Sequence, residues 1–142
     1  MNNKGHSCTF YRILIIFAVL SPFVSTAFAQ DVKIKINAPE TVMIGEQFRV
    51  NYTIESSVEI QEAIIFRNMD GFSILYGPSV SSNRSVSFEK GQRVSVYTYT
   101  SSYFLEALKE GKLSLPRAEI SFKGKKYKSD SFKIEVKSPD KY

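Results

Sequence analysis

Apolar and polar residues alternate strictly over several short stretches of the chain, and the clearest of these is residues 47–55. Phe48, Val50, Tyr52 and Ile54 occupy one phase, while charged or polar residues occupy every position between them. A period of two places successive side chains on opposite faces of a strand. We therefore predict that residues 47–55 form a β-strand with one buried face.

Similar patterns, separated by Gly, Pro and Ser-rich segments, predict further strands along the chain. These lie at residues 31–37, 62–67, 72–76, 81–89, 93–105, 112–124 and 132–136. The stretch 62–67 is apolar on both faces, which favours a central strand but is also consistent with a buried helical turn. Residues 106–111 are the only helix-like piece, about one turn long, with Gly111 as its predicted C-cap.

Gly and Pro mark the places where the chain is predicted to turn. Gly77-Pro78 ends the apolar run 72–76 and precedes a Ser-rich crossing, so we expect a change of direction or of sheet there. Lys90-Gly91 predicts a tight hairpin turn, and Gly124-Lys125 predicts a second turn. The apolar phase also shifts at Pro116, which predicts a bulge or a switch of sheet.

About seven to eight short strands with almost no helix predict an all-β fold, an antiparallel β-sandwich of immunoglobulin type. We assign this sandwich to residues 30–137 as one domain, and residues 138–142 to a C-terminal tail or truncated linker. The Cys and Trp hallmarks of antibody domains are absent from residues 30–137, so the likeness is architectural.

The N-terminal residues 1–29 have the three-part pattern of a signal peptide. Basic residues precede an apolar run at 13–20, and Ala27 and Ala29 form the small-x-small pattern that a signal peptidase requires. We predict cleavage before Gln30 and export of the remaining chain. An uncleaved N-terminal anchor is the alternative, although the apolar run is short for a hydrocarbon core of roughly 30 Å.

Export would leave a chain without Cys or His, because Cys8 and His6 both belong to the signal peptide. Such a chain cannot form a Ser-His-Asp or Cys-His catalytic arrangement, or a zinc site with nitrogen and sulfur ligands. Close carboxylate pairs occur at 59 and 62 and at 106 and 110, in segments that we expect to be exposed. We therefore predict no enzyme activity, no metal, no cofactor and no small-molecule substrate.

The charge of the exported chain is modest. Removing Lys4 and Arg12 leaves 17 basic and 14 acidic residues, a net charge of about +3 (19 − 2 − 14). The excess lies late, with seven lysines between Lys123 and Lys141. These lysines alternate with apolar residues, which favours a solvated strand face over a site for membrane headgroups or nucleic acid. We predict no nucleic-acid partner.

One stretch of the chain is more specific than the others. Residues 71–78 read Gly-Phe-Ser-Ile-Leu-Tyr-Gly-Pro and are followed by Ser81-Ser82. Together with Tyr97-Thr98-Tyr99 and the run Gly-Lys-Leu-Ser-Leu-Pro-Arg-Ala at 111–118, this pattern resembles the N-terminal domain of the BatD oxygen-tolerance family of bacteria. The resemblance covers nearly all of the chain after residue 29.

The resemblance implies a non-catalytic cell-envelope protein built of immunoglobulin-like domains, with a role in aerotolerance or envelope stress. It implies protein partners, namely envelope proteins with von Willebrand factor A domains that are linked to a MoxR-type ATPase system. The implied location is the periplasm or the periplasmic face of the inner membrane. Longer members have further β domains and a transmembrane helix, so we expect this chain to be a short paralogue, a truncated form or a fragment.

Our leading hypothesis is an exported protein-interaction module. The motif residues are assigned a structural role: Gly71, Phe72, Gly77 and Pro78. Nearby polar and aromatic residues are the candidates for binding a partner: Asp70, Tyr76 and Arg84.

The alternative hypothesis is a carbohydrate-binding or adhesin-like β-sandwich module. It is motivated by Tyr97, Tyr99 and Tyr103, which share one phase of a long predicted strand and would form a stacking surface for sugars. Strand tyrosines more often bury the ring and hydrogen-bond the hydroxyl at the rim of the sheet. The exposure of these three rings together is therefore what separates the two hypotheses.

Overall fold

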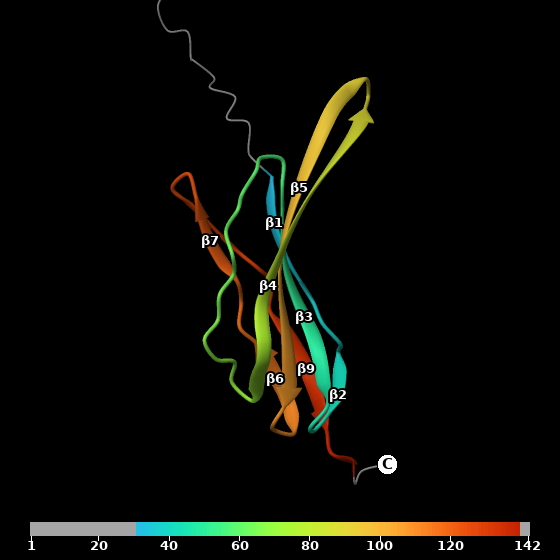
Figure 1. Cartoon of the computed structure of the whole chain (residues 1–142), viewed down its shortest axis with the longest axis vertical. Coiled ribbons are helices and arrows are strands. Elements are labelled where there is room, and N and C mark those ends of the chain that lie inside the picture. Colours follow the sequence, from blue (N-terminus) through green and yellow to red (C-terminus); the bar gives the residue numbers. More distant parts are fainter. Residues whose placement is uncertain (1–30, 140–142) are drawn as a thin grey trace, which may run out of the picture.

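The computed structural model of the chain describes residues 31–139, which form two layers of β-strands (Figure 1). The first layer is a four-stranded antiparallel sheet in the order β1 (Val32–Asn37), β3 (Gln47–Ser56), β5 (Gln92–Ala107) and β4 (Phe72–Glu89). The second layer contains a three-stranded sheet in the order β2 (Thr41–Met43), β9 (Phe132–Lys137) and β6 (Gly111–Leu115). It also contains the hairpin of β7 (Glu119–Phe122) and β8 (Lys125–Lys128).

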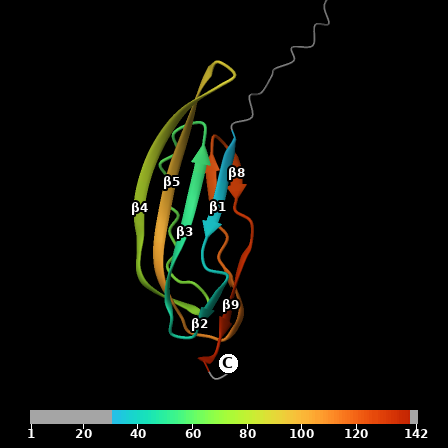
Figure 2. The same ribbon diagram turned by 90° about the vertical axis from the view of Figure 1, so that its right-hand side faces the viewer.

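The predicted all-β sandwich is therefore confirmed, with nine strands rather than seven to eight. Figure 2 shows the two layers from the side, with β3, β4 and β5 in one and β8 and β9 in the other. All strand pairs in residues 31–139 are antiparallel except β2 with β9. Domain boundaries at residues 30 and 137 remain predictions.

The core lies between the layers and is built from the alternating positions that the sequence predicts. In β3, Phe48, Val50, Tyr52 and Ile54 are buried, and every second residue between them is more exposed. Ile134 and Val136 of β9, among others, face them from the second layer. Each such buried side chain contributes about 1.5–3 kcal/mol relative to its exposed state, so the two-residue period fixes which face is inside.

The predicted strand at 62–67 is wrong, and so is the alternative of a helical turn. This segment is irregular, with Ile64 buried and Ile65 exposed. Its backbone is bound by side chains of β5 instead of by a neighbouring strand. The Ile64 N–H donates to Ser101 Oγ at 3.0 Å, and the Phe66 N–H donates to Tyr103 Oη at 2.9 Å.

The Tyr103 hydroxyl forms hydrogen bonds with two backbone groups of this irregular segment, as an acceptor for one and as a donor to the other. Besides accepting from Phe66, it donates to the carbonyl oxygen of Ile64 at 2.6 Å. The Tyr103 ring is fully buried and packs near Tyr52 and Phe66, with ring centroids 6.1 Å and 6.0 Å away. Burial raises the pKa of the Tyr103 hydroxyl, and the hydrogen bond from Phe66 opposes this in part. Apolar residues at 62–66 thus cover the core without forming a strand.

The predicted helical turn at 106–111 is also wrong, because β5 continues to Ala107. Ala107 is buried and pairs with Phe72 of β4, and its backbone also forms hydrogen bonds with residues 45 and 46. Its N–H donates to the carbonyl of Glu46 at 3.2 Å, and its carbonyl accepts from the N–H of Gly45 at 2.8 Å. These tertiary bonds outweigh the local helix propensity of the segment. Gly111 is not a helix C-cap but the first residue of β6.

The expected change of direction or sheet at Gly77-Pro78 does not occur. Residues 72–89 form the single strand β4, which pairs with β5 throughout and has register irregularities between Ile74 and Ser79. The Gly77-Pro78 peptide bond, which is cis, lies within this irregular part. Such bulges bend a strand and increase its twist without ending it. The Ser-rich residues that follow are therefore part of the same strand, not a crossing between sheets.

The other predicted turns are confirmed in kind. Lys90 and Gly91 have positive φ values of 50° and 76° and connect β4 to β5, as expected for a type I′ hairpin turn. The second hairpin turn uses Lys123-Gly124, one residue earlier than predicted. Pro116 lies between β6 and β7, which belong to different sheets, so the phase shift marks a switch of sheet. Within residues 31–139, no helix is long and apolar enough to span a membrane.

Candidate functional site

A two-stranded hairpin arm extends beyond the rest of the sandwich. The last residue of β3, Ser56, pairs with Tyr97, whereas β4 and β5 continue to pair as far as Glu89 and Gln92. We define the hairpin arm as residues 84–97. Figure 1 shows it projecting past the end of the second layer. A segment that lies outside the core gains little from packing, so its side chains are available for other contacts.

The hairpin arm carries the most exposed large apolar side chain of the described residues. The exposed fraction is 77% for Phe88 and 43% for Val86. In the register of the arm, Arg84 pairs with Tyr97, Val86 with Ser95 and Phe88 with Arg93. Residues directly opposite each other lie on one face of an antiparallel pair. Phe88 and Val86 therefore share a face with two arginines and a tyrosine.

This face of the arm is a continuation of the core-facing side of the sheet. Tyr97 has the same phase along β5 as Ser101, Tyr103 and Leu105, which are all buried, and the segment 62–66 lies against Ser101 and Tyr103. The phase does not change along β5, but the second layer ends before the arm begins (Figure 2). The sandwich thus presents a core-like face without a covering layer.

The arm also presents an open strand edge. β4 is the terminal strand of its sheet, and no described residue pairs with the outer side of its residues 79–89, which we call the free edge. Along this stretch the pairing with β5 has no irregularity, and the sequence contains neither Lys nor Pro. Native proteins commonly protect edges with Lys, Pro, bulges or very short strands. The free edge has none of these four protections, and its charged side chains are Arg84 and Glu89.

The other edge strands of the described sheets have six residues or fewer, and β1, β6 and β8 carry lysines. β1, at the opposite side of the same sheet, carries Lys33 and Lys35 on its six residues. β2 has only three residues, and β8 carries three lysines on four residues. The lysine-rich final part of the chain is thus largely a set of solvated strands, in line with the sequence interpretation. The free edge is exceptional within the same molecule.

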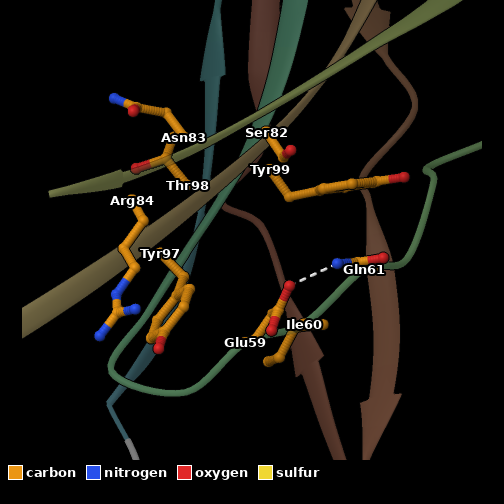
Figure 3. A pocket seen from close by; sticks show the side chains of 9 residues that line it. All are labelled: Glu59, Ile60, Gln61, Ser82, Asn83, Arg84, Tyr97, Thr98 and Tyr99. Carbon is orange, nitrogen blue, oxygen red and sulfur yellow. Dashed lines mark hydrogen bonds between the residues drawn. The ribbon is translucent and has the colours of Figure 1, made fainter.

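A pocket lies at the base of the arm, on its core-facing side (Figure 3). It has a volume of about 240 Å³ and is lined by three short segments: residues 59–61, 82–84 and 97–99. Pockets for small molecules usually measure about 300–1,000 Å³. The pocket is therefore of a size for one side chain of a partner rather than for a complete small-molecule ligand.

Arg84 is held in place at this pocket by contacts with β5. Its guanidinium group lies 5.2 Å from the centroid of the Tyr97 ring, and Nη2 donates to Ser95 Oγ at 3.4 Å. Figure 3 shows Arg84 beside Tyr97, with Glu59 and Gln61 hydrogen-bonded to each other on the facing segment. Arg84 makes no ion pair with any residue of the described range 31–139. It is a fixed positive charge that remains available to an anionic group.

Three of the four residues assigned a structural role lie at closely packed positions, and the fourth, Pro78, is half-buried in β4. A Cβ atom on Gly71 would come 2.7 Å from Leu113 Cδ1, and Gly71 has a φ of +83°. Phe72 is buried and packs edge-to-face on Phe48, with ring centroids 5.6 Å apart. A Cβ atom on Gly77 would come 2.6 Å from the backbone carbonyl oxygen of Ser102. These contacts support the structural role of the motif, which still requires a mutational test.

The three candidate partner-binding residues do not form one site. Asp70 is exposed in the turn before β4, and Tyr76 is exposed at the irregular part of β4, paired with Phe104. Arg84 lies eight positions further along β4, which at about 3.3 Å per residue is roughly 25 Å from Tyr76. Of the three, only Arg84 belongs to the hairpin arm and its pocket.

The three tyrosines of the carbohydrate hypothesis do not form a common surface. Tyr103 is fully buried and bonded to the segment 62–66, whereas Tyr97 and Tyr99 are partly buried and line the pocket. Within the described residues there is no group of three or more His, Cys, Asp and Glu residues that could hold a metal ion. Ala27, Ala29 and Gln30, the predicted cleavage residues, lie outside the described range.

Sequence reasoning missed Val86 and Phe88 as surface residues and missed the free edge. The strand predicted at 81–89 contains both residues, but alternation alone does not show whether a covering layer exists. The available signal was the Ser-rich composition of residues 79–87, which contain neither Lys nor Pro. Such a run next to a tight turn is consistent with an exposed strand that has an open edge.

Comparison with known families gives one match. Residues 36–136 match the family described as BatD DUF11 like domain, from within β1 to within β9. Neither the curated proteins nor the solved structures contain a match to the chain. The family match covers the two layers of the sandwich together with the hairpin arm.

Proposed function

Because the chain belongs to the BatD family, we propose that it is a non-catalytic protein-interaction module whose binding surface is the hairpin arm. The observation that carries this proposal is the arm itself, which holds Phe88 and Val86 away from the core on a fixed two-stranded support. Exposed apolar side chains grouped on a projecting element are typical of interaction sites. The residue types also support a binding role, because residues 31–139 contain neither His nor Cys.

The proposed setting is the bacterial cell envelope. The signal-peptide pattern of residues 1–29 supports export to the periplasm or to the periplasmic face of the inner membrane. The partners that we propose are envelope proteins with von Willebrand factor A domains, linked to a MoxR-type ATPase system. The proposed physiological role is aerotolerance or resistance to envelope stress. These assignments follow from the family, and the arm supplies a surface on which such a partner could be bound.

Co-purification from the envelope of the bacterium that carries this chain tests the proposal. The full chain should recover proteins with von Willebrand factor A domains, and the double variant Val86→Ser, Phe88→Ser should lose most of them. Leu108→Ser is the matched control, because Leu108 is also an exposed apolar residue of 56% exposure but lies just after β5, away from the arm. Equal recovery by all three proteins, or recovery of no such partner, would contradict the proposal.

The carbohydrate-binding or adhesin-like alternative has weaker support. Its stacking ladder is interrupted because Tyr103 is buried, and the pocket beside Tyr97 and Tyr99 is small. Binding to a glycan array that Tyr97→Ala abolishes would favour this alternative over protein binding. Absence of glycan binding above background would remove it.

A further inference from the structure

We propose that the free edge of β4 binds an extended, acidic segment of a partner protein as an additional antiparallel strand. This inference rests on the proposed function, because it specifies how the interaction module binds. It depends on three properties of residues 79–89: the direction of their backbone groups, the pattern of their side chains and the charge of the arm. Adding a strand to an open edge is a recurrent mode of peptide recognition.

The register defines which backbone groups of β4 are available. In a two-residue hairpin turn, Glu89 and Gln92 flank the turn and form a hydrogen-bonded pair. Hydrogen-bonded and non-hydrogen-bonded pairs alternate along an antiparallel ladder. The N–H and C=O groups that point away from β5 therefore belong to alternate residues: Val80, Ser82, Arg84, Val86 and Phe88. They form a regular row of donors and acceptors at the spacing that an added strand requires.

The two faces of the free edge differ in a way that selects the side chains of an added strand. One face carries Arg84, Val86 and Phe88, which favour an acidic residue and apolar residues in the facing positions. The other face carries small polar side chains and, next to the turn, Glu89; the small residues are Ser79, Ser81, Asn83, Ser85 and Ser87. The complementary segment thus alternates between acidic or apolar residues and small polar residues.

Charge favours a partner segment over a second copy of this chain. Residues 79–102 contain Arg84, Lys90 and Arg93 against Glu89, a net charge of +2 (3 − 1). Two such arms side by side would bring like charges together, whereas an acidic segment would not. The Arg84 guanidinium lies 5.2 Å from the Tyr97 ring centroid and has no ion-pair partner among residues 31–139, so a carboxylate of the added strand would meet an unpaired positive charge.

Hydrogen exchange of single amides, measured by NMR, provides the direct test. The probe is a synthetic peptide with blocked ends, Val-Thr-Ile-Thr-Glu-Ser-Glu, designed to place Val opposite Phe88, Ile opposite Val86 and the first Glu opposite Arg84. At millimolar peptide, we expect the outward amides of Arg84, Val86 and Phe88 to exchange at least about tenfold more slowly. The amides of Ser85 and Ser87, which already face β5, should change less. No slowing of the outward amides would overturn the proposal.

Variants of one residue separate backbone binding from side-chain binding. Val86→Pro removes an outward N–H, which an edge strand tolerates because that group faces solvent. We expect it to weaken peptide binding by about tenfold relative to Val86→Ala, which shortens the same side chain and keeps the N–H. Equal affinity of the two variants would contradict strand addition. Because the exchange measurement uses the unmodified chain, it stands even if Val86→Pro fails to fold.

Charge is tested with the peptide in which both Glu residues are replaced by Lys. This peptide should bind more weakly than the acidic one, and raising the salt concentration should reduce the difference. Arg84→Gln should also reduce the difference. If the basic peptide binds equally well at low salt, the segment that binds is not an acidic one.

The outcomes distinguish this inference from the proposed function. If the Val86, Phe88 double variant loses its envelope partners but no peptide slows the outward amides, the module binds with its arm face and the edge proposal is wrong. If outward amides become protected at high concentration of the chain alone, the occupant is a second copy, which also overturns it. If the edge binds the acidic peptide but the double variant keeps all envelope partners, the arm face is not the surface that binds them.

Discussion

The two halves of β5 have the same two-residue period but very different surroundings. In the half that ends at Ala107, Ser101, Tyr103 and Leu105 are buried, and the segment 62–66 binds Ser101 and Tyr103. In the half that begins at Gln92, the equivalent positions belong to the hairpin arm, where nothing in the described range covers Phe88 on the neighbouring strand. The same face of the β4–β5 pair is thus exposed to solvent in the hairpin arm and buried in the core in the rest of the sandwich. The difference shows that burial of a strand face here depends on how far the second layer and the segment 62–66 extend along the sheet.

The change between the two halves coincides with a change in how β4 is supported. Near its start, β4 lies close to β6 and β5, since a Cβ atom added at Gly71 would meet Leu113 and one added at Gly77 would meet Ser102. Along the free edge, it is bound only to β5 among the described strands. We therefore expect packing around the start of β4 to determine the free energy of unfolding of the domain. Substitutions along the free edge should leave the fold intact. The following variants test this division, from the largest expected effect to the smallest.

Gly77→Val should be the most damaging change in the body of the sandwich. Its Cβ would lie 2.6 Å from the backbone oxygen of Ser102, and the φ of +121° is unfavourable for a branched side chain. We expect a loss of at least about 4 kcal/mol in the free energy of unfolding, measured by thermal melting. Gly111→Ala is the control, because Gly111 has a φ of +122° but no atom within 4 Å of the added Cβ. Similar melting of both variants would contradict a packing role for Gly77.

Tyr103→Phe should destabilise the body by about 2–3 kcal/mol, measured by urea denaturation. The hydroxyl satisfies both the Ile64 carbonyl and the Phe66 N–H, and its removal leaves two backbone groups without that partner near the core. The matched variant in the arm is Tyr97→Phe, which should change the stability by less than about 0.5 kcal/mol. Equal effects would show that the segment 62–66 is not held by Tyr103.

Alkaline pH should weaken the same part of the body. Burial raises the pKa of Tyr52 and of Tyr103 above the ordinary value of 10.0, and the proximity of the two rings adds to the shift at Tyr52. The unfolded chain therefore loses these protons first, so the free energy of unfolding is unaffected by these groups below about pH 10 and falls above it. Urea denaturation at several pH values measures this decline. Replacing both tyrosines with Phe should make the decline shallower.

Phe88→Ala should have the smallest effect on stability, within about 0.5 kcal/mol, because the side chain is largely exposed already. Phe72→Ala, at the buried start of the same strand, should cost about 3–5 kcal/mol. Urea denaturation of the two variants compares the halves of β4 directly. A large loss in Phe88→Ala would mean that the arm is part of the folding core rather than a surface.

Much of the fold could be predicted from local patterns. The buried phases of β1, β3 and β9, the Lys90-Gly91 turn and the sheet switch at Pro116 all depend on residues close in sequence. The segment 62–67 could not be predicted, because its backbone partners are the hydroxyls of Ser101 and Tyr103, more than 30 positions away. The end of β5 was missed for the same reason, since Gly45 and Glu46 bind Ala107 from another part of the chain.

The candidate site was predictable only in part. The sequence singled out Arg84 and the motif at 71–78 and excluded the usual nucleophilic and zinc chemistry, since these follow from residue types and short motifs. It also predicted a strand at residues 81–89, and the two-residue period of a strand places Val86 and Phe88 on one face of it. Whether that face is core or surface depends on the extent of the second layer, which is a property of the whole fold.

The amino-acid sequence by itself determined an all-β chain with a two-residue period, because side-chain alternation is a local property of strands. It determined the family as well, since the motif at 71–78 lies within the matched residues 36–136. Only the tertiary structure decided that β4 runs through Gly77-Pro78 as an edge strand and extends past the second layer. A strand is an edge, or has an uncovered face, when no other element lies beside it. The local sequence of the strand does not specify which elements lie beside it.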